Sequence, residues 1–598
     1  ELKALLFFNV KVFFHSIISI FFREVQVIGR HNIPAYGPVI FTTNHANQFL
    51  DAVMVLCTCQ HKISYLIAET SWRRRIIGDI AWAMDAVPVK RAQDSAIQGT
   101  GTICMTPKED EQEAVIEIKG ANTLFATECR VGDKIRPQGT ARQFKIVTLE
   151  SDTVMTVDAI VFDEDDIPQR ETKFDILRRV DQKVVYEKVL DKLASGGAIG
   201  IFPEGGSHDR TELLPLKVGV ALIAYSALEK DGINVPIVPV GLNYFSRHRF
   251  RGSAVVEYGQ PVLIDPQTLP AYAAGGAAKR EVCNELLDKI QDSMKSVIVE
   301  SPDWDTLQMI YTARRLYQKN PKLDPKEKQE LSRRFAEGYK QLLLSVEGQP
   351  PQEWLNLQDR LKAYQKELKE LGIKDYQVIG LDREKYDMDG DTVMREMRLP
   401  YQIGHFVLLL VLAGIPAIFL NLPVGILANL YAERRRKIAL AKSKVKVRGM
   451  DVKLSEKVLF CIVMVPTLWF IYGLLLYKCT DLDGPAIALA GLSMPLFSYM
   501  GVVVTEAGIV GFKDLRPHLM RLFPSARRRL AALPATRRKL QKELRQFIRK
   551  IGPTLGELYY GETVDWQAIQ EKARRQTVMM YADASSPPRG KADAKKDK

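Results

Sequence analysis

Three long apolar stretches in the C-terminal third constrain the fold of this chain more than any other feature. They cover residues 404–430, 458–477 and 485–511, and the first two contain no Asp, Glu, Lys or Arg. A helix needs about 20 apolar residues to cross the hydrocarbon core of a bilayer. Residues 23–400 have the composition of soluble protein instead. The sequence therefore predicts an integral membrane protein with a large water-facing part.

Basic residues predict on which side of the membrane the chain lies. Cytosolic loops of membrane proteins carry an excess of Lys and Arg. Because the sequence after residue 511 is strongly basic, we expect 458–477 and 485–511 to form a hairpin whose open ends face the cytosol. The short loop expected before this hairpin holds eight cations: Arg434, Arg435, Arg436, Lys437, Lys442, Lys444, Lys446 and Arg448.

The stretch 404–430 raises a problem of parity, since a single span there would move the soluble part to the opposite side. Pro416 and Pro423 interrupt it, and its length is too short for two spans. We expect a bent, re-entrant or interfacial segment that returns to the same side.

The aromatic segment 5–22 is expected to lie on the membrane rather than to cross it. Lys11, His15 and Ser19 fall on one stripe of a helix, which favours an interfacial amphipathic helix. Lys11 interrupts the apolar run and no small-residue cleavage site follows, which argues against a cleavable signal.

The chain carries a formal net charge of +13, which suits an anionic partner such as a membrane surface, a phosphorylated substrate or a nucleic acid. Nucleic acid fits poorly, because no stacking aromatic residues interleave with the charges. The seven cysteines are scattered, which predicts reduced, structural thiols in a domain that faces the cytosol.

Alternating strand and helix patterns predict the fold of residues 23–275. Apolar runs at 39–43, 63–69, 200–202 and 237–244 read as buried strands, and helical patterns at 72–80, 175–195 and 218–229 separate them. This alternation predicts an α/β domain with a mixed sheet flanked by helices. Short strand patterns without a long helix indicate a small β-rich insertion at 99–175. Charged helical patterns fill the sequence up to residue 400.

These patterns divide the chain into eight parts. We expect an interfacial helix (1–22), an α/β domain in two parts (23–98 and 176–275), a β-rich insertion (99–175), a helical region (276–400), a helical membrane domain (401–511), basic cytosolic helices (512–581) and a disordered tail (582–598).

His45 and Asp51 are the first candidates for chemistry, because they follow the predicted strand 39–43. A histidine just past a strand end can act as a general base, and an acid beside it can hold the imidazole in the right tautomer. A spacing of six does not put two residues on one helix face. His45 must therefore lie on the loop, with Asp51 reaching back to it.

Two further strand ends carry residues that suit an anionic substrate. Lys90 and Arg91 could clamp a phosphate, the arginine by a bidentate fork and the lysine as a point charge. Glu204 and Gly205 open a loop whose backbone N–H groups could meet an anion or substrate hydroxyls.

Other polar residues near the Glu204 loop leave several interpretations open. His208, Asp209 and Arg210 could form a second acid–base or metal site, but no further His or Cys lies at ligand spacing, so a structural role is favoured. Arg210 and Lys217 could contact phosphate or coenzyme A. The cluster Arg247, His248, Arg249 and Arg251 could meet coenzyme A phosphates or lipid headgroups, or form a solvated face.

These motifs together resemble the glycerolipid acyltransferases that carry an NHxxxxD motif, and most closely the fungal membrane glycerol-3-phosphate/dihydroxyacetone-phosphate acyltransferases. Asn44, His45 and Asp51 match the first motif, residues 78–91 the phosphate-binding second, 202–205 the third and 235–240 the fourth. The resemblance covers residues 24–265. The usual pattern leaves four residues between His and Asp, whereas five intervene here. Either the loop bulges by one residue before Asp51 or the pair is weakened.

The resemblance implies an acyl transfer without a covalent enzyme intermediate, a metal or another cofactor. His45 would take the proton from the sn-1 hydroxyl of glycerol-3-phosphate, or of dihydroxyacetone phosphate, and the alkoxide would attack the thioester of acyl-CoA. Asp51 would steady the imidazolium. Lys90 and Arg91 would hold the phosphate, and Glu204 and Gly205 the glycerol moiety.

Two other functions remain open at this stage. One is the acylation of 1-acylglycerol-3-phosphate, against which the long C-terminal extension and the insertion argue. The other is a catalytically silent membrane protein that binds lipid or acts as a scaffold. For an enzyme of this kind we expect acyl-CoA, the acceptor and the bilayer as partners, a multi-pass location in the endoplasmic reticulum membrane and a catalytic domain facing the cytosol. A homo-oligomer is left open.

Overall fold

The computed structural model describes residues 2–574. The described range has gaps at 91–95, 109–114, 139–142, 159–170, 180–182, 246–249, 302, 319–322, 345–350, 387–399, 402, 406, 409–410, 412–416, 442, 444, 562–563 and 573.

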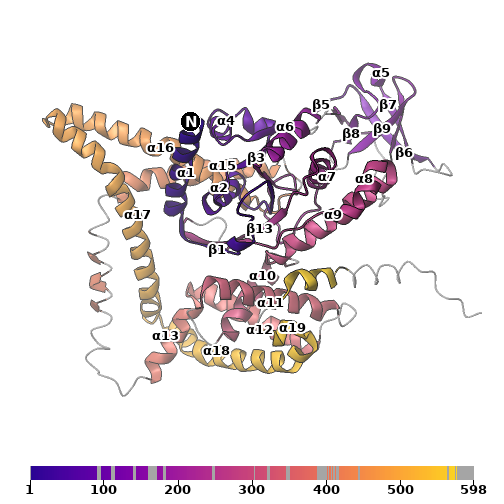
Figure 1. Ribbon diagram of the computed structural model, residues 1–598. Helices are drawn as coiled ribbons and strands as arrows, with labels where there is room; N and C mark the ends of the chain where they lie inside the picture. Colours follow the sequence, from indigo (N-terminus) through magenta and orange to yellow (C-terminus); the bar gives the residue numbers. More distant parts are fainter. Residues whose placement is uncertain are drawn as a thin grey trace, which may run out of the picture.

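A seven-stranded mixed sheet forms the centre of the α/β domain (Figure 1). All its strand pairs are parallel except β13 with β14, which pair antiparallel. The five neighbouring strands from β13 to β4 therefore run in one direction and share their carboxyl edge, which is where open α/β sheets place their sites, while β1 and β14 run the opposite way. Its strands, in spatial order, are β1 (Phe22–Ile28), β14 (Gly252–Tyr258), β13 (Ile237–Tyr244), β2 (Val39–Thr43), β12 (Ala198–Ile201), β3 (Ile63–Ala68) and β4 (Val87–Val89).

Helices cover both faces of this sheet, so it separates two apolar cores. Side chains alternate along a strand, and in β2 Val39 and Phe41 belong to one core and Ile40 to the other. On the first face lie α1 (Leu2–Phe21), α2 (Phe49–Thr58) and the start of α16 (Met450–Cys479). On the second face lie α6 (Lys183–Ala194), α7 (Gly219–Asp231) and α9 (Gly276–Ser296). The mixed sheet flanked by helices confirms the predicted fold class.

The insertion is a separate antiparallel sheet with its own core. Ile103, in the edge strand β6, exchanges two backbone hydrogen bonds of 2.8 and 3.0 Å with Thr172, which lies just before β11 near the opposite edge of the sheet. Of the helix expected at 175–195, residues 175–177 pair in this sheet instead, and the described helix runs from Lys183 to Ala194. The strands are β5 (Ile97–Gln98), β11 (Phe174–Leu177), β8 (Lys134–Pro137), β9 (Phe144–Leu149), β10 (Val154–Asp158), β7 (Val115–Ala121) and β6 (Thr102–Lys108).

A helical body packs below the α/β domain in Figure 1. Its core is formed by α10 (Trp304–Tyr317), α11 (Pro325–Leu344), α12 (Gln352–Leu371), α13 (Asp375–Tyr386) and the basic helix α18 (Pro524–Ile551). Several cations of α18 pair within this body; Arg537, for example, lies 3.0 Å from Asp375. Helix α18 is therefore a packed element of this body, and Arg529, Arg537 and Lys550 form ion pairs with acids of its other helices.

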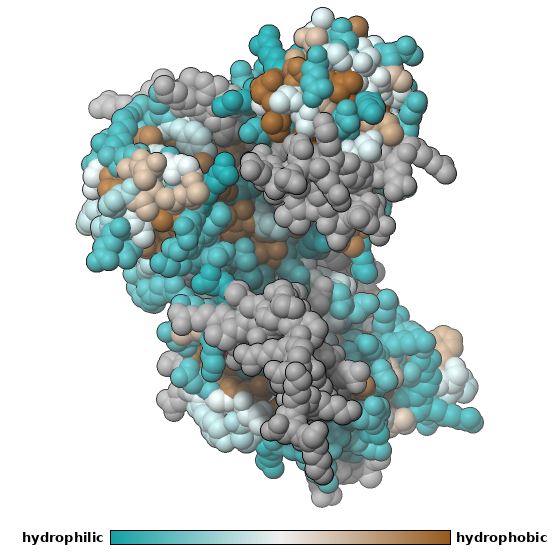
Figure 2. Space-filling model, turned by 90° about the vertical axis from the view of Figure 1, so that its right-hand side faces the viewer, coloured by the Kyte–Doolittle hydropathy of each residue, from teal (hydrophilic) through white to brown (hydrophobic). Residues whose placement is uncertain are grey.

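Within the part of the chain that the structure describes, two helices are long and apolar enough to cross a membrane, α16 and α17 (Gly484–Met520). They project to one side of the molecule in Figure 1 and are joined by the short turn 480–483. The described part of the opposite face is mostly hydrophilic, with several smaller apolar patches (Figure 2). Two long apolar helices joined by a short turn thus occupy the residues at which the sequence predicted the hairpin. Of the segment 404–430, Pro416 lies outside the described residues, and a short π-helix (Ala417–Asn421) precedes α15 (Leu422–Ala441).

The expected loop of eight cations was wrong in part. Arg434 to Lys437 lie within α15, since the surrounding Ala, Leu, Arg and Lys residues are strong helix formers. The connection between α15 and α16 is therefore shorter than predicted. It carries Lys446 and Arg448, and it runs alongside the α/β domain, where Val447 and Arg448 donate backbone hydrogen bonds to Asp209.

Candidate active site

His45 lies on the loop between β2 and α2, at the carboxyl edge of the sheet. The preceding residue fixes the loop, because the side chain of Asn44 exchanges two hydrogen bonds with the backbone of Leu242 in β13, of 2.7 and 3.2 Å. An amide side chain thus extends the strand pairing by one step beyond Thr43. The imidazole that follows is only 17% exposed.

Asp51 is fully buried in the first turn of α2 and reaches back to His45. Its Oδ2 lies 3.0 Å from Nδ1 of His45 and also accepts the N–H of Asn47 at 2.7 Å. Its Oδ1 accepts the hydroxyl of Tyr244, from the end of β13, at 2.7 Å. A carboxylate held by three partners keeps the proton of His45 on Nδ1 and leaves Nε2 as the acceptor.

The residue that lengthens the loop is accommodated by a local bulge. Gln48 has φ 49° and ψ −131°, a conformation that residues with a side chain rarely adopt. The turn lets Asp51 face His45, while Leu50 points into the apolar core with no exposed surface. Of the two alternatives left open by the sequence, the bulged loop is the one that the structure has.

Glu204 connects the β12 loop to the His45 loop. Its Oε1 accepts the N–H of His45 and its Oε2 the N–H of Leu214, both at 2.9 Å, and Oε2 also pairs with Nε2 of His208. Burial acts to raise the pKa of Glu204, but the hydrogen bonds from these three residues outweigh it and hold the pKa below its ordinary value. The Glu204 carboxylate is therefore charged, and both of its oxygens already accept hydrogen bonds from other residues of the protein.

His208 is locked in one neutral tautomer. Its Nδ1 accepts the backbone N–H of Arg210 at 3.2 Å, so the ring proton is on Nε2 and is donated to Glu204. The backbone N–H of His208 donates to the carbonyl of His45 at 3.1 Å. These contacts agree with the structural role for His208 that the sequence favoured, because they join the Glu204 loop to the His45 loop.

Phe202 packs directly on the histidine. The two rings are stacked with centroids 4.1 Å apart, and Tyr65 stacks on the far side of Phe202 at 5.8 Å. This column limits the rotation of the imidazole. The neighbouring Gly205 has φ +75°, and any side chain there would meet Lys217, whose ammonium lies over it. The positive φ favours glycine at this position, whereas the end of the flexible Lys217 side chain can move aside.

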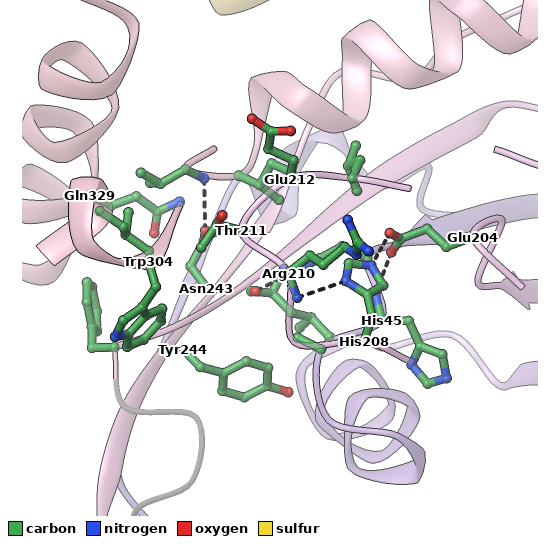
Figure 3. A pocket seen from close by; sticks show the side chains of 18 of the residues that line it. His45, Glu204, His208, Arg210, Thr211, Glu212, Asn243, Tyr244, Trp304 and Gln329 are labelled. Atoms are coloured by element: carbon green, nitrogen blue, oxygen red, sulfur yellow. Dashed lines mark hydrogen bonds and ion pairs between the residues drawn. The ribbon is translucent and has the colours of Figure 1, made fainter. Parts of the chain in front are cut away.

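A cavity of about 40 Å³ lies beside this site, and His45 and Glu204 form one end of it while Trp304 and Gln329 form the other (Figure 3). Arg210 also lines it. A second cavity of about 340 Å³ shares Arg210 and Trp304 with the first and extends toward Arg448. The larger cavity thus lies beside the loop that follows β12, and His45 is not among its lining residues.

The structure does not bring all the predicted residues together. Lys90 follows β4, three strands away from β2, which is a lateral distance of roughly 14 Å at the usual strand spacing. Arg91 lies outside the described residues. Lys217 covers Gly205, and Arg210 is the predicted cation that lines the cavity with His45. Residues 247–249 of the basic cluster are not described, and Arg251 pairs with Glu506 of α17 at 2.6 Å.

Sequence reasoning missed Tyr244 and Phe202 as members of the site. Tyr244 ends a strand that is parallel to β2, so the rule that site residues follow parallel strands could have identified it. No sequence signal pointed to the stacking of Phe202. Among the described residues, no group of three or more His, Cys, Asp or Glu side chains is arranged to hold a metal ion.

Sequence families match most of the chain. The acyltransferase family matches residues 24–118 and 151–243, and the family described as glycerol-3-phosphate acyltransferase 2 C-terminal domain matches residues 309–556. The first match contains His45, Asp51 and Glu204. The second spans the helical body together with α15, α16 and α17.

Curated relatives match over nearly the whole length. The chain is 32% identical to glycerol-3-phosphate O-acyltransferase 1 of Saccharomyces cerevisiae, covering 92% of this chain and 72% of the relative. It is 32% identical to an uncharacterized acyltransferase of Schizosaccharomyces pombe, covering 90% and 80%. It is 29% identical to glycerol-3-phosphate O-acyltransferase 2 of Saccharomyces cerevisiae, covering 97% and 80%.

A solved structure is also similar, the 1-acyl-sn-glycerophosphate acyltransferase PlsC of Thermotoga maritima. The match has 12% identity and a TM-score of 0.26, and it covers 49% of this chain and 80% of that one.

Proposed function

Because this chain belongs to the family of the glycerol-3-phosphate O-acyltransferases, we propose that it transfers a fatty acyl group from acyl-CoA to the sn-1 hydroxyl of glycerol-3-phosphate. The product is lysophosphatidic acid, and dihydroxyacetone phosphate is a second acceptor. The observation that carries the proposal is the His45–Asp51 pair, with Nδ1 held by the carboxylate and the imidazole beside a cavity.

The proposed reaction begins when Nε2 of His45 takes the proton of the acceptor hydroxyl. The oxygen attacks the thioester carbon, the carbon–sulfur bond breaks, and the coenzyme A thiolate receives the proton back from the imidazolium. Asp51 stabilises the imidazolium in between, as a carboxylate does in related triads. In this proposal His45 and Asp51 perform the proton transfers without a metal or cofactor.

We assign the acceptor phosphate to Arg210, because it is the cation that lines the cavity with His45. Guanidinium groups bind phosphate by paired hydrogen bonds. The sequence assigned this role first to Lys90 and Arg91. Lys90 follows a strand three positions away from β2, so we place it nearer to the rim of the site than Arg210. Glu204 supports the site by holding the two loops together, because its carboxylate oxygens already accept hydrogen bonds from the protein.

We further propose that the enzyme is a multi-pass protein of the endoplasmic reticulum membrane, with the α/β domain on the cytosolic side. The basic residues in and after α15 support this orientation through the positive-inside rule. Helix α1 would lie at the bilayer surface, since Leu5, Phe8 and Val12 are exposed while Phe14 and Ile18 pack inward.

One assay tests the function. Purified full-length protein in lipid nanodiscs is given labelled acyl-CoA with glycerol-3-phosphate, dihydroxyacetone phosphate or lysophosphatidic acid. Transfer to glycerol-3-phosphate is expected. Transfer to lysophosphatidic acid alone would replace the proposal by the other acyltransferase reaction, and no transfer to any acceptor would favour a silent lipid-binding or scaffold protein.

A further inference from the structure

Helix α16 is longer than a membrane span requires. Its 30 residues extend about 45 Å at 1.5 Å per residue, whereas the hydrocarbon core is about 30 Å thick. The first ten residues are mostly buried against the α/β domain, and Ser455 and Asp451 have no exposed surface. The later residues are largely apolar and more exposed, as Phe470 is at 68%. The helix thus has a docked part and a membrane part.

The docked part reaches the loop that carries His45. The hydroxyl of Ser455 donates a hydrogen bond to the backbone carbonyl of Asn47, although 408 positions separate the two residues. That carbonyl also accepts the N–H of Leu50 at 3.1 Å. The N–H of the same Asn47 donates to Asp51 at 2.7 Å. Asn47 therefore lies directly between α16 and the carboxylate that orients the histidine.

The bond from Ser455 holds a peptide group that borders the strained residue of the loop. The carbonyl of Asn47 belongs to the peptide that leads into Gln48, with its φ of 49°. Unfavourable backbone conformations persist only where surrounding contacts hold them. Ser455 supplies such a contact from outside the loop, in a buried position where water cannot replace it.

The same end of α16 is joined to the loop after β12. The carboxylate of Asp209 accepts the backbone N–H groups of Val447, Arg448 and Met450 at 2.8, 2.8 and 3.1 Å, which caps the start of α16. Burial acts to raise the pKa of Asp209, but these three donors outweigh it and lower the pKa. Ser207 donates to Asp451 at 2.7 Å. Both loops of the site are therefore attached to one helix end.

We propose that Ser455 is a positioning residue for the His45–Asp51 pair, acting through Asn47. The start of a membrane helix then belongs to the catalytic apparatus, so that the geometry of the acid–base pair depends on the docking of α16. This inference rests on the function proposed above. It differs from that proposal because Ser455 touches neither substrate nor the reacting atoms.

The test is a double-mutant cycle on the full-length protein in nanodiscs, made of Ser455→Ala, Asp51→Asn and the pair of changes. We expect Ser455→Ala to lower kcat about tenfold with the KM of both substrates within twofold. In the Asp51→Asn background the same change should have no further effect, because residues that act as a unit are not additive. Ser455→Thr keeps the hydroxyl and should retain most of kcat.

Ser296→Ala is the matched control, because Ser296 is also a buried helical serine that donates to a backbone carbonyl, that of Ser293 at 2.7 Å. It belongs to α9, which packs on the other face of the sheet from α2 and α16. The variant should leave kcat unchanged. Equal losses of kcat in Ser455→Ala and Ser296→Ala would overturn the inference. So would an effect of Ser455→Ala on kcat that is the same with and without Asp51→Asn. In either case the acceptor assay on the wild-type protein would still support the proposed function. If Ser455→Ala does not fold, the inference is tested with Ser455→Thr and Asp209→Asn instead. An unchanged kcat in Asp209→Asn would then count against the inference.

Discussion

Asp51 reaches back from the first turn of α2 and places Oδ2 3.0 Å from Nδ1 of His45, with five residues between them. The longer spacing therefore keeps the pair in hydrogen-bonding geometry. The consequence is a base whose proton position is set by a buried carboxylate, and each part of this arrangement can be tested separately.

His45→Ala is expected to lower kcat about a hundredfold to ten-thousandfold, the usual contribution of a general base. The fold should survive, because the imidazole packs on Phe202 at the edge of the site and is not part of either core. Turnover with acyl-CoA and glycerol-3-phosphate and a thermal unfolding curve measure the two effects. His31→Ala, at an exposed position, serves as the control. Retained turnover in His45→Ala would remove the general-base assignment.

Tyr244→Phe is expected to lower kcat about tenfold, because the buried Oδ1 of Asp51 loses its hydroxyl donor. An unsatisfied buried acceptor costs about 1–3 kcal/mol. Tyr258→Phe is a matched control, since Tyr258 is a buried tyrosine on the adjacent strand whose hydroxyl bonds to Thr58 at 2.8 Å. Comparable losses of kcat in both variants would show that Tyr244 has no special relation to Asp51.

Gln48→Gly is expected to stabilise the protein by about 1 kcal/mol, because glycine adopts φ 49° without steric cost. Gln48→Ile should destabilise it, since a β-branched side chain is the least compatible with this conformation. Thermal unfolding of both variants in the same nanodiscs measures the difference. An unfolding temperature of Gln48→Gly below that of Gln48→Ile contradicts the strained loop.

Some of this site could be predicted from the sequence, because it depends on local patterns. Apolar runs predicted the strands, and parallel strands put their ends at one edge, so that His45 and Glu204 were expected close together. The order of strands is not local, and β4 lies three positions from β2, so the sequence could not show that Lys90 would be distant from the histidine.

Contacts between remote segments were equally hidden from the sequence. A serine at the start of a predicted membrane span has no signature that connects it to a loop 408 positions earlier, and the bond from Ser455 to Asn47 exists only after α16 docks on the sheet. The partners of Glu204 were also unpredictable, because two of them are backbone N–H groups whose positions depend on the folded loops. Sequence patterns identified the chemistry of the residues, and packing decided their neighbours.

Glu204→Gln is expected to destabilise the protein at neutral pH. The amide has only one acceptor oxygen, whereas the two oxygens of Glu204 accept hydrogen bonds from His45, His208 and Leu214. The pKa of Glu204 is lowered from its ordinary value of 4.5. The ionised carboxylate therefore contributes stability that is fully present above pH 4.5 and is lost as the pH falls through the lower folded value. The difference in unfolding temperature between wild type and variant should be constant from pH 7 to about 5 and shrink below that. If the difference in unfolding temperature instead grows as the pH falls, the charged state assigned to Glu204 is wrong.

Arg210→Ala is expected to raise the KM for glycerol-3-phosphate at least tenfold and leave the KM for acyl-CoA within twofold. Hydrogen bonds to charged groups contribute about 1.5–3 kcal/mol, and a tenfold change corresponds to about 1.4 kcal/mol. Arg210→Lys should recover only part of the affinity, because an ammonium lacks the paired donors of a guanidinium. The variant Arg280→Ala removes an exposed arginine of α9 and controls for the change in net charge. If the KM for acyl-CoA rises instead, Arg210 contacts the donor, and the acceptor phosphate must be held by another cation at the edge of the cavity.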